Sequence, residues 1–151
     1  VKLIHQFKYH GQLYLGKTLA KLFLEKYIAS HSNTIHPDLI VPIPLHVKRL
    51  KHRGFNQSNE VSQYLSKKMK IECNNNLLKR IKLTHTQRGL TLEERKANLK
   101  NAFAKTEQNF NQKHIVLVDD VMTTGNTVDE VAKVLKQAGA KQVDVWTIAR
   151  A

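Results

Sequence analysis

Two adjacent carboxylates, followed by a short segment rich in threonine and glycine, are the residues of this sequence best suited to chemistry. Residues 115–127 read IVLVDDVMTTGNT, in which four apolar residues precede Asp119 and Asp120. The apolar run predicts a buried strand, and the apolar spacing that follows predicts a helix over 127–138. The pattern therefore predicts two carboxylates at the carboxyl end of a strand and a tight turn leading into a helix.

The turn between that strand and that helix has the features of a phosphate site. The start of a helix offers unpaired backbone N–H groups and about half an elementary positive charge from the helix dipole. Gly125 allows a backbone conformation that other residues avoid. The hydroxyls of Thr123, Thr124 and Thr127 add hydrogen-bond donors. Thr127 and Glu130 have the spacing of a capping box, which predicts that the helix begins there.

Asp119 and Asp120 would repel a phosphate unless they bind another part of the same ligand. Ionised carboxylates only accept hydrogen bonds, and two adjacent hydroxyls are good donors to such a pair. A molecule with a phosphate at one end and a vicinal diol nearby is a sugar phosphate, and ribose 5-phosphate has this arrangement. The residues alone therefore favour a sugar-phosphate site.

Other phosphate-binding classes fit this segment less well. A nucleoside-triphosphate loop requires lysine and then serine or threonine after its last glycine, whereas Asn126 follows Gly125. No predicted strand is followed by the GxGxxG pattern of dinucleotide-binding folds. A phosphoacceptor signalling domain needs more chain than the 31 residues that follow Asp120. A capped helix with surface threonines that binds no ligand stays open as an alternative.

The net charge of +13 is carried by the first two thirds of the chain. The first 100 residues hold 19 Lys and Arg against six acids, whereas the remainder holds six of each. A basic cluster of this kind predicts a polyanionic partner, which can be phosphate, pyrophosphate or nucleic acid. A solvated basic face is the alternative. The densest basic segment contains no acid and includes Lys48, Arg49, Lys51 and Arg53.

Length and composition predict one domain over residues 1–151. The chain is 41% hydrophobic, as globular proteins are, and it has no repeats or low-complexity tracts. Cys73 is the single cysteine, which excludes an internal disulfide and a cysteine-based zinc ribbon within these residues. No apolar run reaches the length of a membrane span and no signal peptide is recognisable, so we expect a cytoplasmic protein without membrane insertion.

Apolar periodicity predicts strands that alternate with helices, and therefore an α/β fold. Apolar runs such as 39–43 and 114–118 indicate buried strands of a mainly parallel, twisted sheet flanked by helices. Ligands of such folds bind at the carboxyl ends of strands, here just after Ile43, Leu83 and Val118. Further strands are expected at 77–83, 101–104 and 142–148, and helices at 3–8, 12–29, 58–69, 92–99 and 127–138.

Several segments resemble one known family. VLVDDVMTTGNT resembles the phosphoribosyl pyrophosphate (PRPP) motif of type I phosphoribosyltransferases, and this motif is specific. Within that class, VPIPLHVKRLKHRGFNQS at 41–58 and THTQRGLTLEERKANLKNAF at 84–103 resemble segments of the ComF family of competence proteins. FKYHG at 7–11 is similar to the N-terminal part of that family, so the resemblance covers nearly the whole chain.

The resemblance implies roles for the residues of the PRPP motif. Asp119 and Asp120 would hold the 2- and 3-hydroxyls of ribose and would be the catalytic carboxylates. The 5-phosphate would be wrapped by Met122, Thr123, Thr124, Gly125, Asn126 and Thr127.

The resemblance also implies how the pyrophosphate is held. Arg49, Arg53 and Arg88 would contact it. The polar segment 84–98 would be a mobile hood loop that closes over the ligand, with Arg95 as a further candidate contact. Mg²⁺ would enter with PRPP, and no metal site is expected from protein side chains alone.

In function, the resemblance implies phosphoribosyl transfer from PRPP with release of pyrophosphate, in a protein that acts in DNA uptake during natural transformation. No residue identifies the acceptor nucleophile. The alternative is a non-catalytic PRPP sensor that binds single-stranded DNA and works with proteins of the DNA-uptake machinery. Family members often carry a four-cysteine zinc ribbon ahead of this region. This sequence lacks it, so either the chain begins after the ribbon or this member has none.

Overall fold

The computed structural model describes residues 13–30, 37–83, 91–106 and 111–150. Strands and helices alternate within them, as the sequence predicts for the α/β class. The helix expected at 3–8 lies outside the described residues. The helices are α2 (Leu13–Ser30), α3 (Val47–Arg53), α4 (Gln57–Met69), α5 (Leu92–Leu99) and α6 (Asn126–Gln137), and the strands are β1 (Leu39–Pro42), β2 (Glu72–Cys73), β3 (Leu78–Arg80), β4 (Phe103–Lys105), β5 (His114–Met122) and β6 (Gln142–Arg150).

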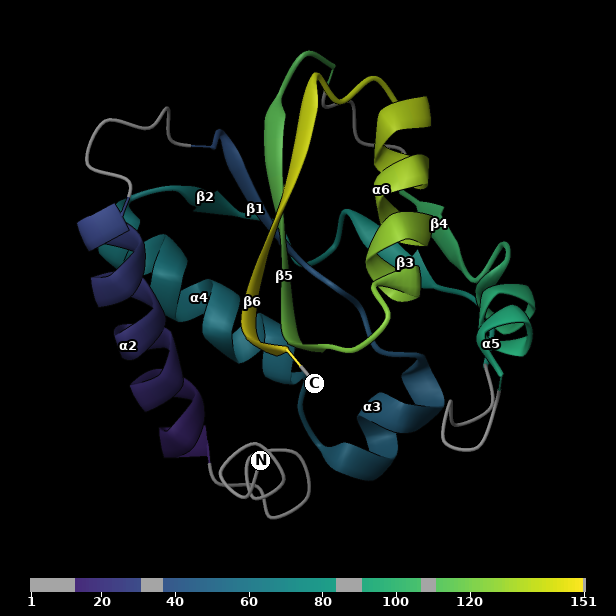
Figure 1. Cartoon of the computed structure of the whole chain (residues 1–151), viewed down its shortest axis with the longest axis horizontal. Coiled ribbons are helices and arrows are strands. Elements are labelled where there is room, and N and C mark those ends of the chain that lie inside the picture. The colour runs from purple at the N-terminus through teal and green to yellow at the C-terminus, as the bar shows by residue number, and fades with distance from the viewer. Residues whose placement is uncertain (1–12, 31–36, 84–90, 107–110, 151) are drawn as a thin grey trace.

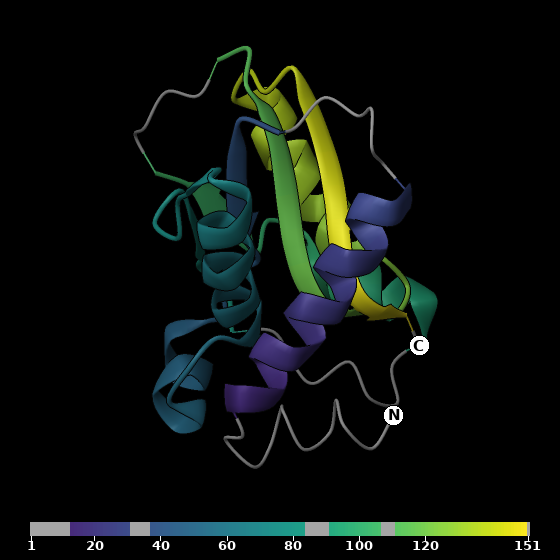
Figure 2. The same ribbon diagram turned by 90° about the vertical axis from the view of Figure 1, so that its left-hand side faces the viewer.

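Four strands form one sheet in the order β2-β1-β5-β6, and every neighbouring pair is parallel. The helices cover both faces: α2 and α4 lie on one side of the sheet and α6 lies on the other (Figure 1). Seen after a quarter turn, α2 and α4 lie in front of the sheet and α6 lies behind it (Figure 2). This arrangement confirms the predicted parallel sheet flanked by helices.

Alternate residues of β5 pack into two cores, one on each face of the sheet. Ile115 and Leu117 join side chains of α6 in the first core, and Val116 and Val118 join those of α2 and α4 in the second. All four residues are fully buried. Because successive strand residues point to opposite faces, burial on both sides requires an unbroken apolar run. Trp146 of β6 is buried in the second core.

Residues 77–83 depart from the prediction of one strand of the parallel sheet. Only Leu78–Arg80 form a strand, and this strand, β3, pairs antiparallel with β4 in a separate two-stranded sheet. Ile81 and Leu83 are 60% and 47% exposed, so the apolar residues that indicated a longer buried strand lie at the surface. Leu83 is therefore not at a carboxyl end of the parallel sheet. The edge next to β1 is formed by β2, whose two residues are too few to give a periodic signal.

The start of α6 also differs from the prediction. The helix begins at Asn126, and its N-cap is Gly125, which has a φ of 79° and makes no side-chain capping bond. Glu130, the predicted capping partner of Thr127, instead accepts a hydrogen bond from the Asn101 backbone N–H at 3.0 Å. Glu130 thereby ties α6 to the turn that follows α5.

A capping box does occur, at the start of α5. The Thr91 backbone N–H donates to Glu94 Oε2 at 2.7 Å, and the Glu94 N–H donates to Thr91 Oγ1 at 3.2 Å. The backbone and side-chain hydrogen bonds with Thr91 lower the pKa of the Glu94 carboxyl. The spacing of this pair is the same as that of Thr127 and Glu130, so spacing alone does not tell which pair caps a helix.

None of the described helices has both the length and the apolar character needed to span a bilayer.

The central position of β5 makes its apolar residues the main determinants of stability. We expect Leu117→Ala to lower the free energy of unfolding by about 2–5 kcal/mol, because the substitution leaves a cavity in a strand buried on both faces. Leu22→Ala is the matched control, since Leu22 is 57% exposed on α2, and its effect should stay within about 0.5 kcal/mol. Urea unfolding of both variants measures the difference, and equal midpoints would contradict the expectation.

Candidate functional site

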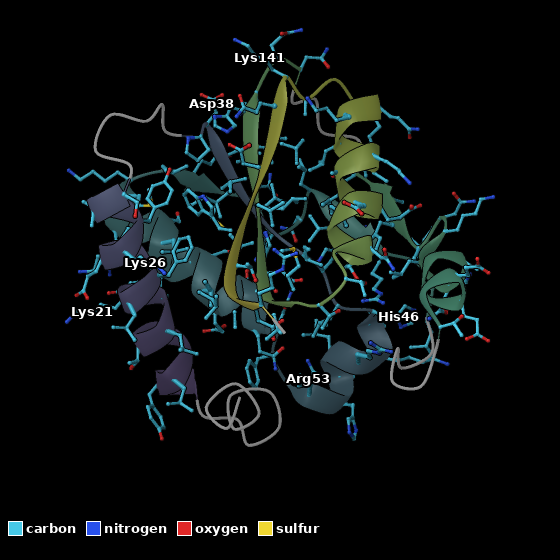
Figure 3. All side chains as sticks on the ribbon, viewed as in Figure 1. Lys21, Lys26, Asp38, His46, Arg53 and Lys141 are labelled. Atoms are coloured by element: carbon cyan, nitrogen blue, oxygen red, sulfur yellow. The ribbon has the colours of Figure 1, made fainter. Side chains whose placement is uncertain are left out.

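The carboxyl ends of β1 and β5 open into a cleft of about 820 Å³, where an α/β fold is expected to bind its ligand. Figure 3 shows His46 and Arg53 around α3 at this end of the molecule, whereas Asp38 and Lys141 lie at the opposite end of the sheet. The cleft is lined by residues drawn from 43–58, by Arg80 and by residues 119–128.

The two predicted carboxylates lie within β5 rather than after it, because the strand continues to Met122 beside β6. Asp119 and Asp120 both line the cleft. Asp119 Oδ1 accepts a hydrogen bond from the Asp120 backbone N–H at 2.9 Å, and Asp120 Oδ1 accepts one from the Val121 N–H at 2.8 Å. These local hydrogen bonds fix how the carboxylates are turned. The strand thus presents two oriented acceptors to one cavity, as a diol ligand requires.

The turn between β5 and α6 presents hydrogen-bond donors to the same cavity. The first intrahelical bond runs from the Asp129 N–H to the Gly125 carbonyl at 2.9 Å, so the N–H groups before it have no intrahelical partner. Asn126 is 8% exposed, yet its Nδ2 donates to no described residue. A buried donor without an acceptor is destabilising. An anion bound at the turn would supply that acceptor.

The helix α3 contributes most of the basic side chains of the cleft. None of its residues is buried, so the helix is held mainly at its ends. His46 Nδ1 accepts a hydrogen bond from the Lys48 N–H at 3.2 Å at the start, and the Gly54 N–H donates to the Leu50 carbonyl at 2.8 Å at the end. The residues of α3 that line the cleft are Lys48, Arg49, His52 and Arg53.

Arg80 of β3 is a cleft residue that the sequence analysis did not single out. Its guanidinium lies over the ring of Phe103, 5.3 Å from the ring centroid. Burial and, to a smaller extent, the like charge of Arg49 lower the pKa of Arg80 to about 10, while the carboxylate of Asp119 opposes the shift. Arg80 therefore lies within electrostatic reach of both ends of the proposed site. The sequence of β3, Leu78-Lys79-Arg80, gives no local signal that distinguishes Arg80 from Lys79.

The structure brings most of the predicted ligand-binding residues together in one cavity. Two predicted arginines, Arg88 and Arg95, are the exceptions. Arg49 and Arg53 share one cavity with Asp119 and with the turn at residues 122–127. Arg88 lies outside the described residues, as does the first part of the predicted hood loop, residues 84–90; Arg95 lies in α5, but its side chain is not described. The described lining carries four Lys and Arg side chains against two carboxylates, and this excess favours a ligand of high negative charge.

Cys73 lies outside the cleft lining and is not suited to nucleophilic chemistry. Burial raises the pKa of its thiol to about 11, and the neighbouring Glu72 charge acts in the same direction. We expect iodoacetamide at pH 8 to alkylate Cys73 about 100-fold more slowly in the folded protein than in urea, because only the thiolate reacts. Mass spectrometry of timed samples measures both rates. Equal rates would show that the folded thiol is exposed and ordinarily acidic.

Comparison with known proteins identifies the class of protein to which this fold belongs. Residues 20–151 match the family model of the phosphoribosyl transferase domain. Among solved structures, adenine phosphoribosyltransferase from Saccharomyces cerevisiae superposes with a TM-score of 0.59 at 11% identity, over 91% of this chain and 69% of that one. Glutamine PRPP amidotransferase from B. subtilis gives a TM-score of 0.58 at 16% identity, over 88% of this chain and 26% of that one. At these identities the structures show a shared fold.

Relatives of higher identity identify the branch within this class. Competence protein F of Haemophilus influenzae is 42% identical, over 99% of this chain and 67% of that protein. DNA utilization protein YhgH of Escherichia coli is 39% identical, over 98% and 66%. Competence protein ComFC of Streptococcus pneumoniae is 30% identical, over 96% and 60%. The chain therefore belongs to the ComF family of phosphoribosyltransferase-fold proteins, and it spans about two thirds of the length of the first two relatives.

Proposed function

We propose that this protein binds PRPP in the cleft at the carboxyl ends of β1 and β5. The observation that carries the proposal is the combination of chemical groups that line one cavity. A donor-rich turn at the start of α6, the two carboxylates of β5 and the basic helix α3 all line it. PRPP has a matching series of groups: a 5-phosphate, a ribose diol and a diphosphate.

Each part of the ligand has a counterpart among the described residues. The turn at 122–127 accommodates the 5-phosphate through backbone N–H groups and the buried amide of Asn126. Asp119 and Asp120 accept hydrogen bonds from the ribose hydroxyls. The diphosphate lies toward α3, where Arg49 and Arg53 provide positive charge. Arg80 lines the same cleft and provides a third guanidinium for the diphosphate.

In this proposal Mg²⁺ enters the site together with the ligand. The described residues include no group of three or more His, Cys, Asp or Glu side chains that could hold a metal ion. Mg²⁺ takes six oxygen ligands and is commonly held by one or two carboxylates and substrate phosphates. Asp119 and Asp120 would supply the protein oxygens, and the ion would neutralise charge on the departing diphosphate.

We further propose that the bound PRPP is a substrate for phosphoribosyl transfer. Loss of pyrophosphate leaves positive charge on the sugar, which the carboxylates of Asp119 and Asp120 would stabilise, while the basic side chains would stabilise the leaving group. A PRPP sensor uses the same cleft without this step. Pyrophosphate release measured with a panel of nucleobases and amines separates the two: release with any acceptor supports transfer, and silence across the panel favours the sensor.

Ligand-dependent stabilisation tests the binding proposal with small quantities of protein. At 100 times its Kd, PRPP with Mg²⁺ should stabilise the fold by about 2.7 kcal/mol and raise the Tm by about 5–10 °C. Ribose 5-phosphate and pyrophosphate should each give a smaller increase, because each fills part of the cleft. Unchanged melting with all three ligands would contradict the proposal.

A role in DNA uptake with single-stranded DNA as a second partner is supported by the names of the relatives and by basic residues outside the cleft. If about six phosphates are contacted, affinity should fall roughly 10³-fold between about 50 and 200 mM salt. The basic residues in question are Lys51 of α3 and the exposed Lys67, Lys68 and Lys70 at the end of α4. Alanine substitutions at these four lysines should weaken DNA binding and leave PRPP binding intact. DNA binding that does not change with salt concentration would contradict the role.

A further inference from the structure

Gln57 is a neutral polar residue buried beside the cleft. It is 1% exposed, it is the first residue of α4, and it lines the cavity. Its Oε1 accepts a hydrogen bond from Nη1 of Arg53 at 3.0 Å. Buried polar side chains are generally hydrogen-bonded, and this one is bonded to a cleft arginine. The orientation of Arg53 is therefore coupled to a rigid part of the fold.

Hydrogen bonds connect Asn56, the residue before Gln57, to the central strand. The Ile43 N–H donates to the carbonyl of Val118 at 3.0 Å, and the Ile43 carbonyl accepts from Asn56 Nδ2 at 3.0 Å. Asn56 caps α4 immediately before Gln57. Val118 immediately precedes Asp119. These hydrogen bonds, together with the peptide bonds on either side of them, link the strand that carries the carboxylates to the arginine on the other side of the cleft.

The chemistry of Gln57 suits an arginine that must keep its charge. Arg53 is the last residue of α3, a helix without buried residues, so its long side chain needs an anchor to stay in one orientation. A glutamate at position 57 would bond the guanidinium more strongly and would suit the start of α4. Its charge would, however, offset the charge of Arg53. An amide oxygen holds the guanidinium and leaves its full positive charge for an anionic ligand.

We propose that Gln57 is a positioning residue that fixes Arg53 against the diphosphate group of the ligand, at a set distance from the carboxylates of β5. This inference rests on the proposed PRPP site. Gln57 acts through Arg53, so its contribution is confined to ligands that carry a diphosphate. Ribose 5-phosphate occupies the other end of the cleft and does not depend on it.

A double-mutant cycle with two probes tests the proposal. Gln57→Met keeps the size of the buried side chain and removes the acceptor, and Arg53→Met removes the donor. We expect Q57M to weaken inorganic pyrophosphate binding about five- to tenfold and to leave ribose 5-phosphate within about twofold. The double variant should bind pyrophosphate within about twofold of R53M, because Gln57 has nothing left to position. Gln63→Met, at an exposed site of α4, is the matched control and should bind both probes as the wild type does.

Several results would overturn the inference. Unchanged pyrophosphate affinity in Q57M, equal losses for both probes, or additive losses in the double variant would each do so. If Q57M does not fold, R53M alone still tests the proposal. Unchanged pyrophosphate affinity in R53M would show that Arg53 does not contact the diphosphate, and Gln57 would then have no binding residue to position. Wild-type protein that binds neither PRPP nor pyrophosphate would overturn this inference and the proposed function together. Wild-type binding of PRPP together with an unchanged pyrophosphate affinity in Q57M would overturn this inference and leave the proposed function standing.

Discussion

Replacing Asp119 and Asp120 together by asparagine is expected to weaken PRPP binding by at least about 100-fold. Each carboxylate accepts a charge-assisted hydrogen bond from a ribose hydroxyl in the proposed complex, and such bonds contribute about 1.5–3 kcal/mol each. Asparagine keeps the size of each side chain, and its amide Oδ1 can still accept the local backbone bond. The fold should therefore survive. Equilibrium dialysis against labelled PRPP measures the loss.

The same double substitution should act differently on the two halves of the ligand. Ribose 5-phosphate affinity should fall with that of PRPP, because both carry the diol. In the absence of Mg²⁺, inorganic pyrophosphate should bind as well as before or better, because two negative charges near an anion have been removed. Asp129→Asn is the control: Asp129 is an exposed carboxylate in the first turn of α6 that does not line the cleft. Equal losses for pyrophosphate and ribose 5-phosphate would indicate general damage and contradict the assignment.

Arg80→Ala is expected to lower affinity for pyrophosphate and PRPP by about 10- to 100-fold, the range for loss of one or two hydrogen bonds to a charged group. Arg80 is half-buried, so its charge is partly desolvated, and this burial lowers its pKa. A partly desolvated charge interacts more strongly with a bound anion than an exposed one does. Calorimetric titration with pyrophosphate measures the change.

Two further variants separate the position of Arg80 from its charge. Lys79 is the preceding residue of β3 and is exposed, so Lys79→Ala removes one charge from the same strand without entering the cleft. It should change pyrophosphate affinity less than twofold. Arg80→Lys keeps the charge but loses the planar group that covers Phe103. The pyrophosphate affinity of this variant should lie between that of the wild type and that of Arg80→Ala. Equal effects of the two alanine variants would show that only net charge matters.

The parts of the site that lie close together in sequence could be predicted from it. Asp119 and the turn through residue 127 follow one another, so an apolar run, two acids and a glycine were enough to indicate their chemistry. The details of the backbone were less predictable. The strand extends through the carboxylates because β6 continues to pair with it, and that pairing is not visible in a local pattern.

Residues that act through distant partners could not be predicted in the same way. The role proposed for Arg80 depends on Arg49 and Asp119, which are far from it in sequence, and β3 lies outside the parallel sheet. Gln57 follows a basic segment near the start of a predicted helix, and only its burial and its bond to Arg53 support the role proposed for it. Both depend on tertiary packing, for which composition and periodicity carry no signal.

The central claim is that one cleft binds both charged ends and the diol of PRPP. Calorimetric titration of the wild-type protein and the D119N/D120N variant with PRPP and Mg²⁺ tests it most directly. We predict saturable heat with one ligand per chain for the wild type, and no measurable saturation for the variant at the same concentrations. No binding heat from the wild-type protein, or the same binding curve from both proteins, would contradict the claim.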